Sequence, residues 1–157
     1  MKKTLVVPAL FFVSLLSMIS CDSSSDSEND QITSTDINAI RSSVVNGDWR
    51  ITFFFDTDKE ETTNFTNFIF SFNDDGTLVA TNGNQTVSGV WSVTDSNSSD
   101  DDNPSSSDVD FNIFFATPSN FEELSEDWDI LEFSATTIKL THVSGGNGGT
   151  DFLTFEK

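Results

Sequence analysis

Apolar and polar residues alternate with a period of two over most of the chain after residue 47. Successive side chains of a β-strand point to opposite faces of its sheet, so this alternation predicts strands with one buried face. Segments rich in Gly, Asn and Asp, such as residues 73–76, 82–84 and 145–149, are typical of the turns between strands. Eight strands are predicted, within residues 49–55, 68–72, 78–80, 87–93, 109–115, 130–131, 138–143 and 152–156.

Two short segments have helical rather than strand spacing. Apolar residues three and four apart predict a helix within residues 33–45, which Gly47 would help to end. Ser119 and Glu122 have the spacing of a capping box and predict a second helix over residues 119–126. With so little helix, the fold class is all-β. An eight-stranded antiparallel barrel is favoured because closure removes exposed sheet edges, and a β-sandwich is the alternative.

The predicted interior is unusually rich in phenylalanine. The chain has 16 Phe and 3 Trp but no Tyr, so the inward face offers large apolar rings with few hydroxyl groups. Such a face is compatible with a packed core or with a cavity for a small apolar or amphiphilic ligand. The candidate lining residues for that cavity are Phe53, Phe55, Phe68, Phe70, Trp91, Phe111, Ile113 and Leu140.

The N-terminus has the pattern of an export signal. Lys2 and Lys3 precede about a dozen mostly apolar residues, too few for a membrane-spanning helix but typical of a signal peptide. Cys21, the only cysteine, follows directly in the segment SMISC, which resembles the lipobox of bacterial lipoproteins. That resemblance implies cleavage before Cys21 and a lipid anchor on its sulfur. The expected organisation is a signal peptide (1–20), a lipidated Cys with an acidic tether (21–35) and a barrel domain (36–157).

The segment after Cys21 bears on which membrane surface the protein occupies. Residues 22–30 contain four acids and no apolar side chain, which predicts a flexible tether. Asp22 resembles the inner-membrane retention signal of enterobacterial lipoproteins, whereas the whole acidic run resembles the surface-export signal of Bacteroidetes lipoproteins. The rest of the chain favours the second interpretation. We therefore expect the outer membrane, with the domain facing outward.

Several segments of the domain are similar to known lipoproteins. Gly47 and Trp49 open the first strand after a short helix, and the strings FSFNDDGTL (70–78), VSGVWSV (87–93) and TDFLTFE (150–156) follow. Together they resemble the lipocalin-like, calycin-type lipoproteins of Bacteroidetes. The resemblance implies an eight-stranded barrel without catalytic residues, in which Gly47 and Trp49 form the barrel-closing motif. In lipocalins an Arg near the last strand covers this Trp, and here Lys157 is the basic residue near that strand.

The net negative charge of the chain argues against two classes of binding partner. Asp and Glu outnumber Lys and Arg by 26 to 7, giving a net charge of -19, which argues against binding nucleic acid or an anionic membrane surface. Asp100, Asp101 and Asp102 lie in an acidic run and are weak candidates for Ca²⁺, but the EF-hand spacing is missing, since Ser106 stands where the bidentate Glu should be. We interpret the run as a solvated loop and expect no cofactor or bound metal.

No catalytic pattern emerges from the sequence. His142 is the only histidine and lies in a predicted strand, so it is interpreted as a structural or rim residue rather than a zinc ligand. There is no Gly-x-Ser-x-Gly elbow, and the acid pairs at 122–123 and 127–129 fall in segments predicted to be solvated. The prediction is a non-enzymatic, membrane-anchored lipoprotein whose barrel binds a small apolar ligand. The alternative is an interaction or structural lipoprotein with a filled barrel that acts through its acidic loops; neither version identifies a protein partner.

Overall fold

The computed structural model describes residues 36–95, 109–144 and 149–157. Cys21, the predicted signal peptide and tether, and Asp100, Asp101 and Asp102 lie outside these described residues. In chain order the elements are α1 (Ile37–Val44), β1 (Arg50–Asp56), β2 (Lys59–Glu60), the 3-10 helix η2 (Thr62–Phe65), β3 (Ile69–Phe72), β4 (Thr77–Thr81), β5 (Thr86–Asp95), β6 (Val109–Phe114), α2 (Ser119–Glu122), β7 (Asp127–Phe133), β8 (Thr137–Val143) and β9 (Thr150–Glu156).

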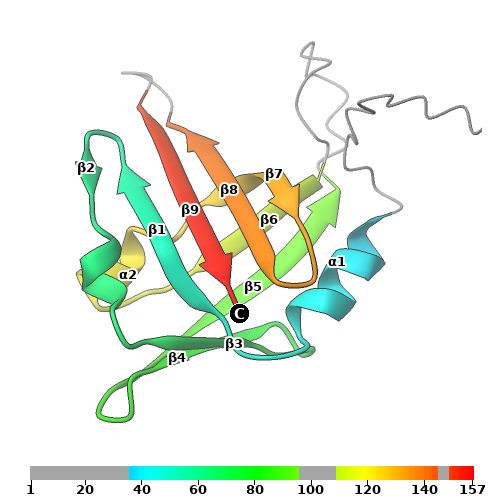
Figure 1. The fold of residues 1–157 in the computed structure, drawn as a ribbon, viewed down its shortest axis with the longest axis horizontal. Helices are drawn as coiled ribbons and strands as arrows, with labels where there is room; N and C mark the ends of the chain where they lie inside the picture. The colour runs from blue at the N-terminus through cyan, green and yellow to red at the C-terminus, as the bar shows by residue number, and fades with distance from the viewer. Residues whose placement is uncertain (1–35, 96–108, 145–148) are drawn as a thin grey trace, which may run out of the picture.

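The strands form one antiparallel sheet that curls on itself. Their order is β2-β1-β9-β8-β7-β6-β5-β4-β3, so the eight predicted strands are present and the two-residue β2 is a ninth. The sheet makes a half-barrel whose two ends approach each other (Figure 1). A bridge joins these ends, with the Trp49 amide donating to the Phe70 carbonyl at 2.9 Å and the reverse bond at 2.8 Å. The predicted all-β antiparallel fold is confirmed, with closure at a bridge instead of along a whole strand.

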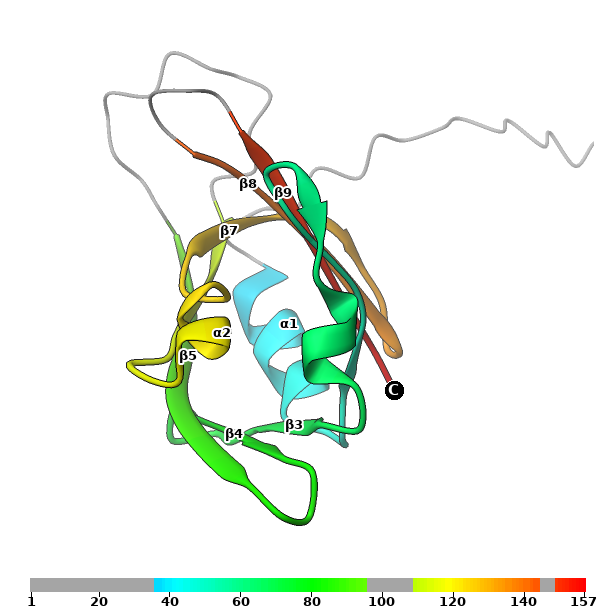
Figure 2. The same cartoon turned by 90° about the vertical axis from the view of Figure 1, so that its left-hand side faces the viewer.

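Helices lie at both ends of the barrel. Figure 2 views the barrel end-on, with α2 and η2 in front and α1 behind the ring of strands. Each helix turns apolar side chains towards the interior: Ile40 and Val44 from α1, Phe65 from η2 and Phe121 from α2 are all buried. None of the helices in the described ranges has the length and apolar character needed to cross a membrane.

The interior is filled by aromatic rings from many strands. Phe121 of α2 packs against the rings of Phe65, Phe68, Phe70 and Phe115, with centroids 5.1 to 6.1 Å apart. A second group centres on Phe72, whose ring meets those of Trp91, Phe111 and Phe155 at 5.3 to 5.7 Å. Phe70 and Phe155 are themselves 5.4 Å apart and join the two groups. These are the edge-to-face and tilted geometries of a packed aromatic core.

The first strand departs from simple alternation. The pairing of β1 with β9 shifts between Ile51 and Phe53, which is the signature of a β-bulge. A bulge adds one residue and so reverses the faces beyond it. Phe54 is therefore fully buried, while Phe53 is 40% exposed and stacks with Phe55 on the outer surface. The prediction that Phe53 and Phe55 point into the barrel is wrong.

Two glycines are required by the turns and the packing around them. Gly76 has φ +86° in the β3–β4 hairpin, and its amide donates to the Asn73 carbonyl at 3.0 Å. Gly89 lies on β5, where a Cβ would come within 2.4 Å of the Phe114 carbonyl oxygen and 2.6 Å of the Phe115 ring. A larger residue at position 89 would force β5 and β6 apart.

Candidate functional site

The Trp49 end of the barrel is closed by side chains from three parts of the chain. Trp49 is fully buried, and its indole Nε1 donates to the Val44 carbonyl of α1 at 2.8 Å. Lys157 lies over the indole ring, with Nζ 4.4 Å from the centroid, and donates to the Ser43 carbonyl at 3.1 Å. Gly47, with φ +111°, has the aliphatic part of Lys157 3.6 Å from where its Cβ would be. The basic residue beside the last strand thus covers Trp49.

Six of the eight candidate lining residues point inward. They are buried within the packed core and are Phe68, Phe70, Trp91, Phe111, Ile113 and Leu140. The polar edge of Trp91 is satisfied, because its Nε1 donates to the Asn73 carbonyl at 2.9 Å. The rings around these residues contact one another across the barrel, so the side chains proposed to line a ligand cavity instead pack against each other.

Carboxylates gather at the other end of the barrel. We define the acidic rim as Asp56, Glu61, Glu123, Glu126, Asp127 and Asp151, which lie close enough for their charges to act on one another. They come from the end of β1, the segment before η2, the end of α2, the start of β7 and the start of β9. Because these segments meet only in the folded sheet, the rim could not be read from the sequence.

Glu61 and Glu123 form a hydrogen-bonded carboxyl pair on this rim. Glu61 is buried, pairs with Lys59 and accepts a hydrogen bond from the Asn64 amide at 2.8 Å. The hydrogen bonds with Lys59 and Glu123 lower the pKa of Glu61. Burial and the hydrogen bond with Glu61 raise the pKa of Glu123. As the pH rises, Glu61 therefore loses its proton before Glu123 does.

Asp151 has a structural place on the rim. It is buried and accepts hydrogen bonds from the Thr57 amide at 2.7 Å, the Thr57 hydroxyl at 3.2 Å and the Ser144 hydroxyl at 3.3 Å. Thr57 has φ 51°, a conformation that is uncommon for a β-branched residue. Asp151 thus holds the β1–β2 turn against the start of β9.

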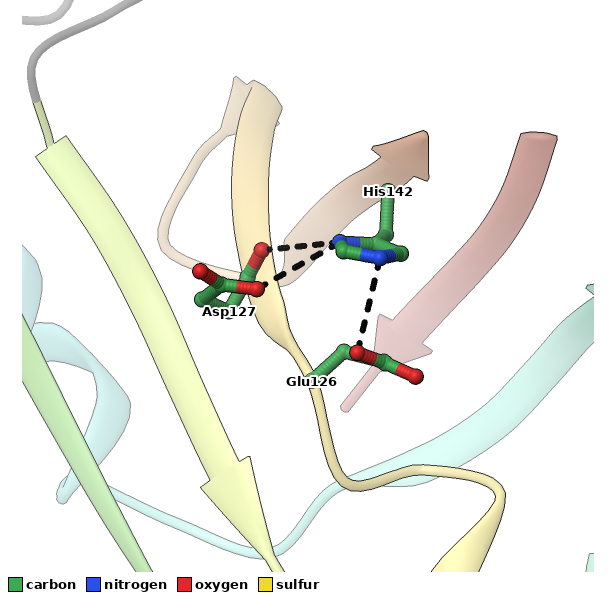
Figure 3. Close-up of side chains that lie close together, drawn as sticks. All are labelled: Glu126, Asp127 and His142. Atoms are coloured by element: carbon green, nitrogen blue, oxygen red, sulfur yellow. Dashed lines mark hydrogen bonds and ion pairs between the residues drawn. The ribbon is translucent and has the colours of Figure 1, made fainter. Parts of the chain in front are cut away.

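His142 lies between two acidic side chains at the start of β7 (Figure 3). Its Nε2 is 3.4 Å from Glu126 Oε2, and its Nδ1 is 3.5 Å from Asp127 Oδ1 and 3.2 Å from the Asp127 carbonyl oxygen. The ring of Trp128 packs edge-to-face against the imidazole, with the two centroids 6.2 Å apart. The ligand atoms of the three residues lie within 4.8 Å of one another.

The strand register explains how this cluster forms. The pairing of β7 with β8 runs inward from Asp129 and Thr141, so His142 lies one residue beyond the pair nearest the rim. The chain leads into β7 through Glu126 and Asp127, and both reach the imidazole from there. Sequence reasoning interpreted His142 as a structural or rim residue and did not connect it with Asp127, which is 15 residues away in the chain. The β7–β8 hairpin register is the signal that would have brought them together.

Apolar side chains also remain on the outside of the sheet. Val90 and Phe114 are register partners on β5 and β6 and are 54% and 57% exposed. They line an open depression of about 590 Å³ on the outer surface, which reaches Asn112 and Asp127. A separate outer pair, Phe53 and Phe55, results from the β1 bulge. A cavity for a ligand was expected inside the barrel, but this depression lies outside it.

The chain was compared with known families, curated proteins and solved structures. No protein-family model and no curated protein matches it. A crystal structure of a DUF4847 family protein from Bacteroides vulgatus is similar, with a TM-score of 0.44 and 16% sequence identity. The match covers 72% of this chain and 93% of the other.

Proposed function

We propose that this protein is a non-enzymatic, lipid-anchored envelope lipoprotein that makes its contacts on the outside of a filled barrel. The observation that carries the proposal is the aromatic packing of the interior, where the Phe72 and Phe121 groups meet through Phe70 and Phe155. Pockets for drug-sized ligands hold roughly 300 to 1,000 Å³. Rings in mutual contact at 5 to 6 Å centroid distances leave little of that volume at the barrel centre.

Charge indicates the class of partner. A net charge of -19 creates a negative field that attracts cationic partners and repels nucleic acid and anionic lipid. The acidic rim concentrates part of this charge where α2 and the ends of β1 and β9 meet. The expected partner is therefore a cationic protein segment rather than a polyanion.

Anchoring rests on the N-terminal sequence alone. The lipobox-like segment ending at Cys21 and the acidic run that follows it favour attachment to the outer membrane, with the domain outward. Substituting Cys21→Ser should move the protein from the membrane fraction to the soluble fraction, because it removes the lipidated sulfur. A C21S protein that still sediments with membranes would contradict the anchor.

A small apolar or amphiphilic ligand is the second candidate. The observation that favours it is the outer depression beside Phe114, since its volume of about 590 Å³ suits a small molecule. In this version the ligand would lie on the outer face of β5 and β6 rather than within the barrel.

Native mass spectrometry of the full-length protein, extracted gently from its own host, separates these proposals. A filled barrel predicts the mass of the lipidated chain alone. An apolar molecule that copurifies and is lost on denaturation would overturn the first proposal. If Phe114→Ala removes that molecule and Phe111→Leu does not, the ligand lies in the outer depression.

A further inference from the structure

We infer that His142 and Glu126 form a binding site for a divalent transition-metal ion, with Asp127 positioning the imidazole. Zn²⁺ is the ion that we expect. The inference goes beyond the proposed function and does not depend on it, because the cluster is formed by the folded domain whether or not the chain is anchored. It replaces the sequence-based interpretation of His142 as a residue without a metal role.

The imidazole is oriented for metal binding. Its Nδ1 lies 3.2 Å from the Asp127 carbonyl oxygen, so Nδ1–H can donate there, with the Asp127 carboxylate 3.5 Å away. A neutral imidazole that donates from Nδ1 carries its free lone pair on Nε2. This arrangement, in which an oxygen holds one ring nitrogen and frees the other, is the usual support of metal-binding histidines.

The distance from Nε2 to Glu126 matches two ligands of one ion. The separation of 3.4 Å is longer than the 2.7 to 3.2 Å typical of an N–H···O hydrogen bond. Tetrahedral ligands that are each about 2.1 Å from Zn²⁺ lie roughly 3.4 Å apart. The gap between Nε2 and Oε2 is thus long for a hydrogen bond and matches the spacing of two ligands that share an ion.

The surroundings favour a cation. Glu126 lies among other carboxylates, because Asp127, Asp151 and Asp56 are all close enough for their charges to act on it. Most basic side chains of the described residues are engaged elsewhere: Arg41 with Asp74 and Trp91, Lys59 with Glu61, Lys139 with Glu132, and Lys157 with Trp49. A bound cation would offset the repulsion among these carboxylates.

The donor set selects the type of ion. An imidazole nitrogen suits Zn²⁺ and its neighbours in the transition series, whereas Ca²⁺ and Mg²⁺ prefer oxygen ligands alone. The protein supplies two ligand groups, with the Asp127 carboxylate within reach of the same region, and water completes the coordination. Affinity should therefore be weaker than at a structural site with four protein ligands.

The decisive experiment uses the fact that the chain has one histidine. The full-length protein, without a polyhistidine tag, is treated with a chelator, dialysed and titrated with ZnCl₂ at pH about 7.5, where the ligands are more readily deprotonated. The imidazole ¹⁵N signals belong to His142 without ambiguity. The expected result is a saturable shift of Nε2 at one equivalent of Zn²⁺, with no comparable shift from CaCl₂.

Calorimetry with matched variants tests each role. His142→Gln and Glu126→Gln should each weaken Zn²⁺ binding by more than about tenfold, and Asp127→Asn by about tenfold, as expected for an outer partner. Glu132→Gln is the control, because it removes one carboxylate from the same strand at a distance from the cluster. Glu132→Gln changes the general negative charge but none of the proposed ligands. Its affinity for Zn²⁺ should therefore stay within about twofold of the wild-type value.

The outcomes that overturn the inference are distinct from folding defects. If His142→Gln does not fold, the imidazole titration of the wild-type protein still decides. Imidazole signals that do not move with Zn²⁺, or equal weakening by Glu126→Gln and Glu132→Gln, would reduce the cluster to an ion pair on an acidic surface.

Discussion

The two ends of the barrel differ in how well their polar and charged groups are compensated. At the Trp49 end, the indole donates to Val44 and is covered by Lys157, so a large apolar group is buried with its one polar atom satisfied. At the acidic rim, Glu123 and Glu126 lie among other carboxylates and have raised pKa values, caused first by burial. The first end contributes to folding stability, whereas the second retains unfavourable charge. For this reason we propose the acidic rim, rather than the Trp49 end, as the place where a partner would bind.

Removing the closing tryptophan should have the largest effect on this comparison. Trp49→Ala empties a fully buried position and leaves the Val44 carbonyl without its indole donor, so we expect a loss of about 3 to 5 kcal/mol in the free energy of unfolding. Urea denaturation would measure it. Phe114→Ala is the matched control, since that ring is 57% exposed and its loss should cost less than about 0.5 kcal/mol. Similar losses in both variants would mean that Trp49 does not close the barrel.

Removing the buried carboxylate of Asp151 should lower the free energy of unfolding by less than removing Trp49 does. Asp151→Ala removes the carboxylate that accepts from the Thr57 amide, and a hydrogen bond to a charged group contributes about 1.5 to 3 kcal/mol. Asp151→Asn retains an acceptor oxygen and should lose clearly less, as measured by the same denaturation. If the two variants are equally destabilised, the negative charge rather than hydrogen bonding is what position 151 contributes.

Lys157, which lies over the Trp49 indole, should contribute less than Asp151 to the free energy of unfolding. Lys157→Met keeps an unbranched chain over Trp49 but removes the charge, so it should lose the cation–π interaction, about 0.5 to 1 kcal/mol at an exposed site, together with the hydrogen bond to the Ser43 carbonyl. Lys157→Ala should lose these interactions and also the packing of the aliphatic part of the side chain against Gly47 and Trp49. Thermal unfolding of the two variants separates these contributions, and a wild-type stability for Lys157→Ala would remove Lys157 from the closed end.

The pH dependence of the free energy of unfolding tests the charges of the acidic rim without any substitution. A carboxyl whose pKa is raised by folding binds its proton more tightly in the folded state, so acid stabilises the fold between its folded and unfolded pKa values. Glu123 and Asp56 have raised values, from ordinary values of 4.5 and 3.8. The free energy of unfolding should therefore increase as the pH falls from neutral towards these ordinary values. Below about pH 4 it should decrease, as Glu61 and Asp75, whose pKa values are lowered, become protonated.

The substitution Glu123→Gln should reduce part of this dependence of stability on pH. Glu123→Gln supplies a permanent donor to Glu61 and removes the charge, so it should stabilise the protein at neutral pH and reduce the gain on acidification. Glu122→Gln removes the same charge from the adjacent position and is the control. Chemical denaturation at several pH values checks both, and identical profiles for the two variants would contradict a shared proton between Glu61 and Glu123.

Much of the fold was predictable because most strands bury one face. On β5 and β6 the buried set Val87, Trp91, Val93, Phe111 and Ile113 follows the alternation without exception. On β1 the run Phe53-Phe54-Phe55 is apolar throughout, so polarity gives no information about which ring is inside. The bulge between Ile51 and Phe53 decided that, and it depends on pairing with β9.

The candidate site was largely hidden from the sequence. His142 and its neighbours were judged one at a time, and neither a single histidine nor adjacent acids indicate a metal site. Their proximity follows from the register of β7 and β8, which places His142 one residue beyond the Asp129–Thr141 pair. The rim as a whole depends in the same way on strand ends brought together by the curl of the sheet.

The sequence by itself determined the all-β class, the eight longer strands, the β3–β4 turn at Gly76 and the short helix α1, because these follow from local periodicity and backbone preference. Only the tertiary structure decided the inward Phe54, the partial closure at Trp49 and Phe70, and the cluster of Glu126, Asp127 and His142. The physical reason is range: local patterns fix the period of each strand, whereas register and curvature arise from packing between strands distant in sequence.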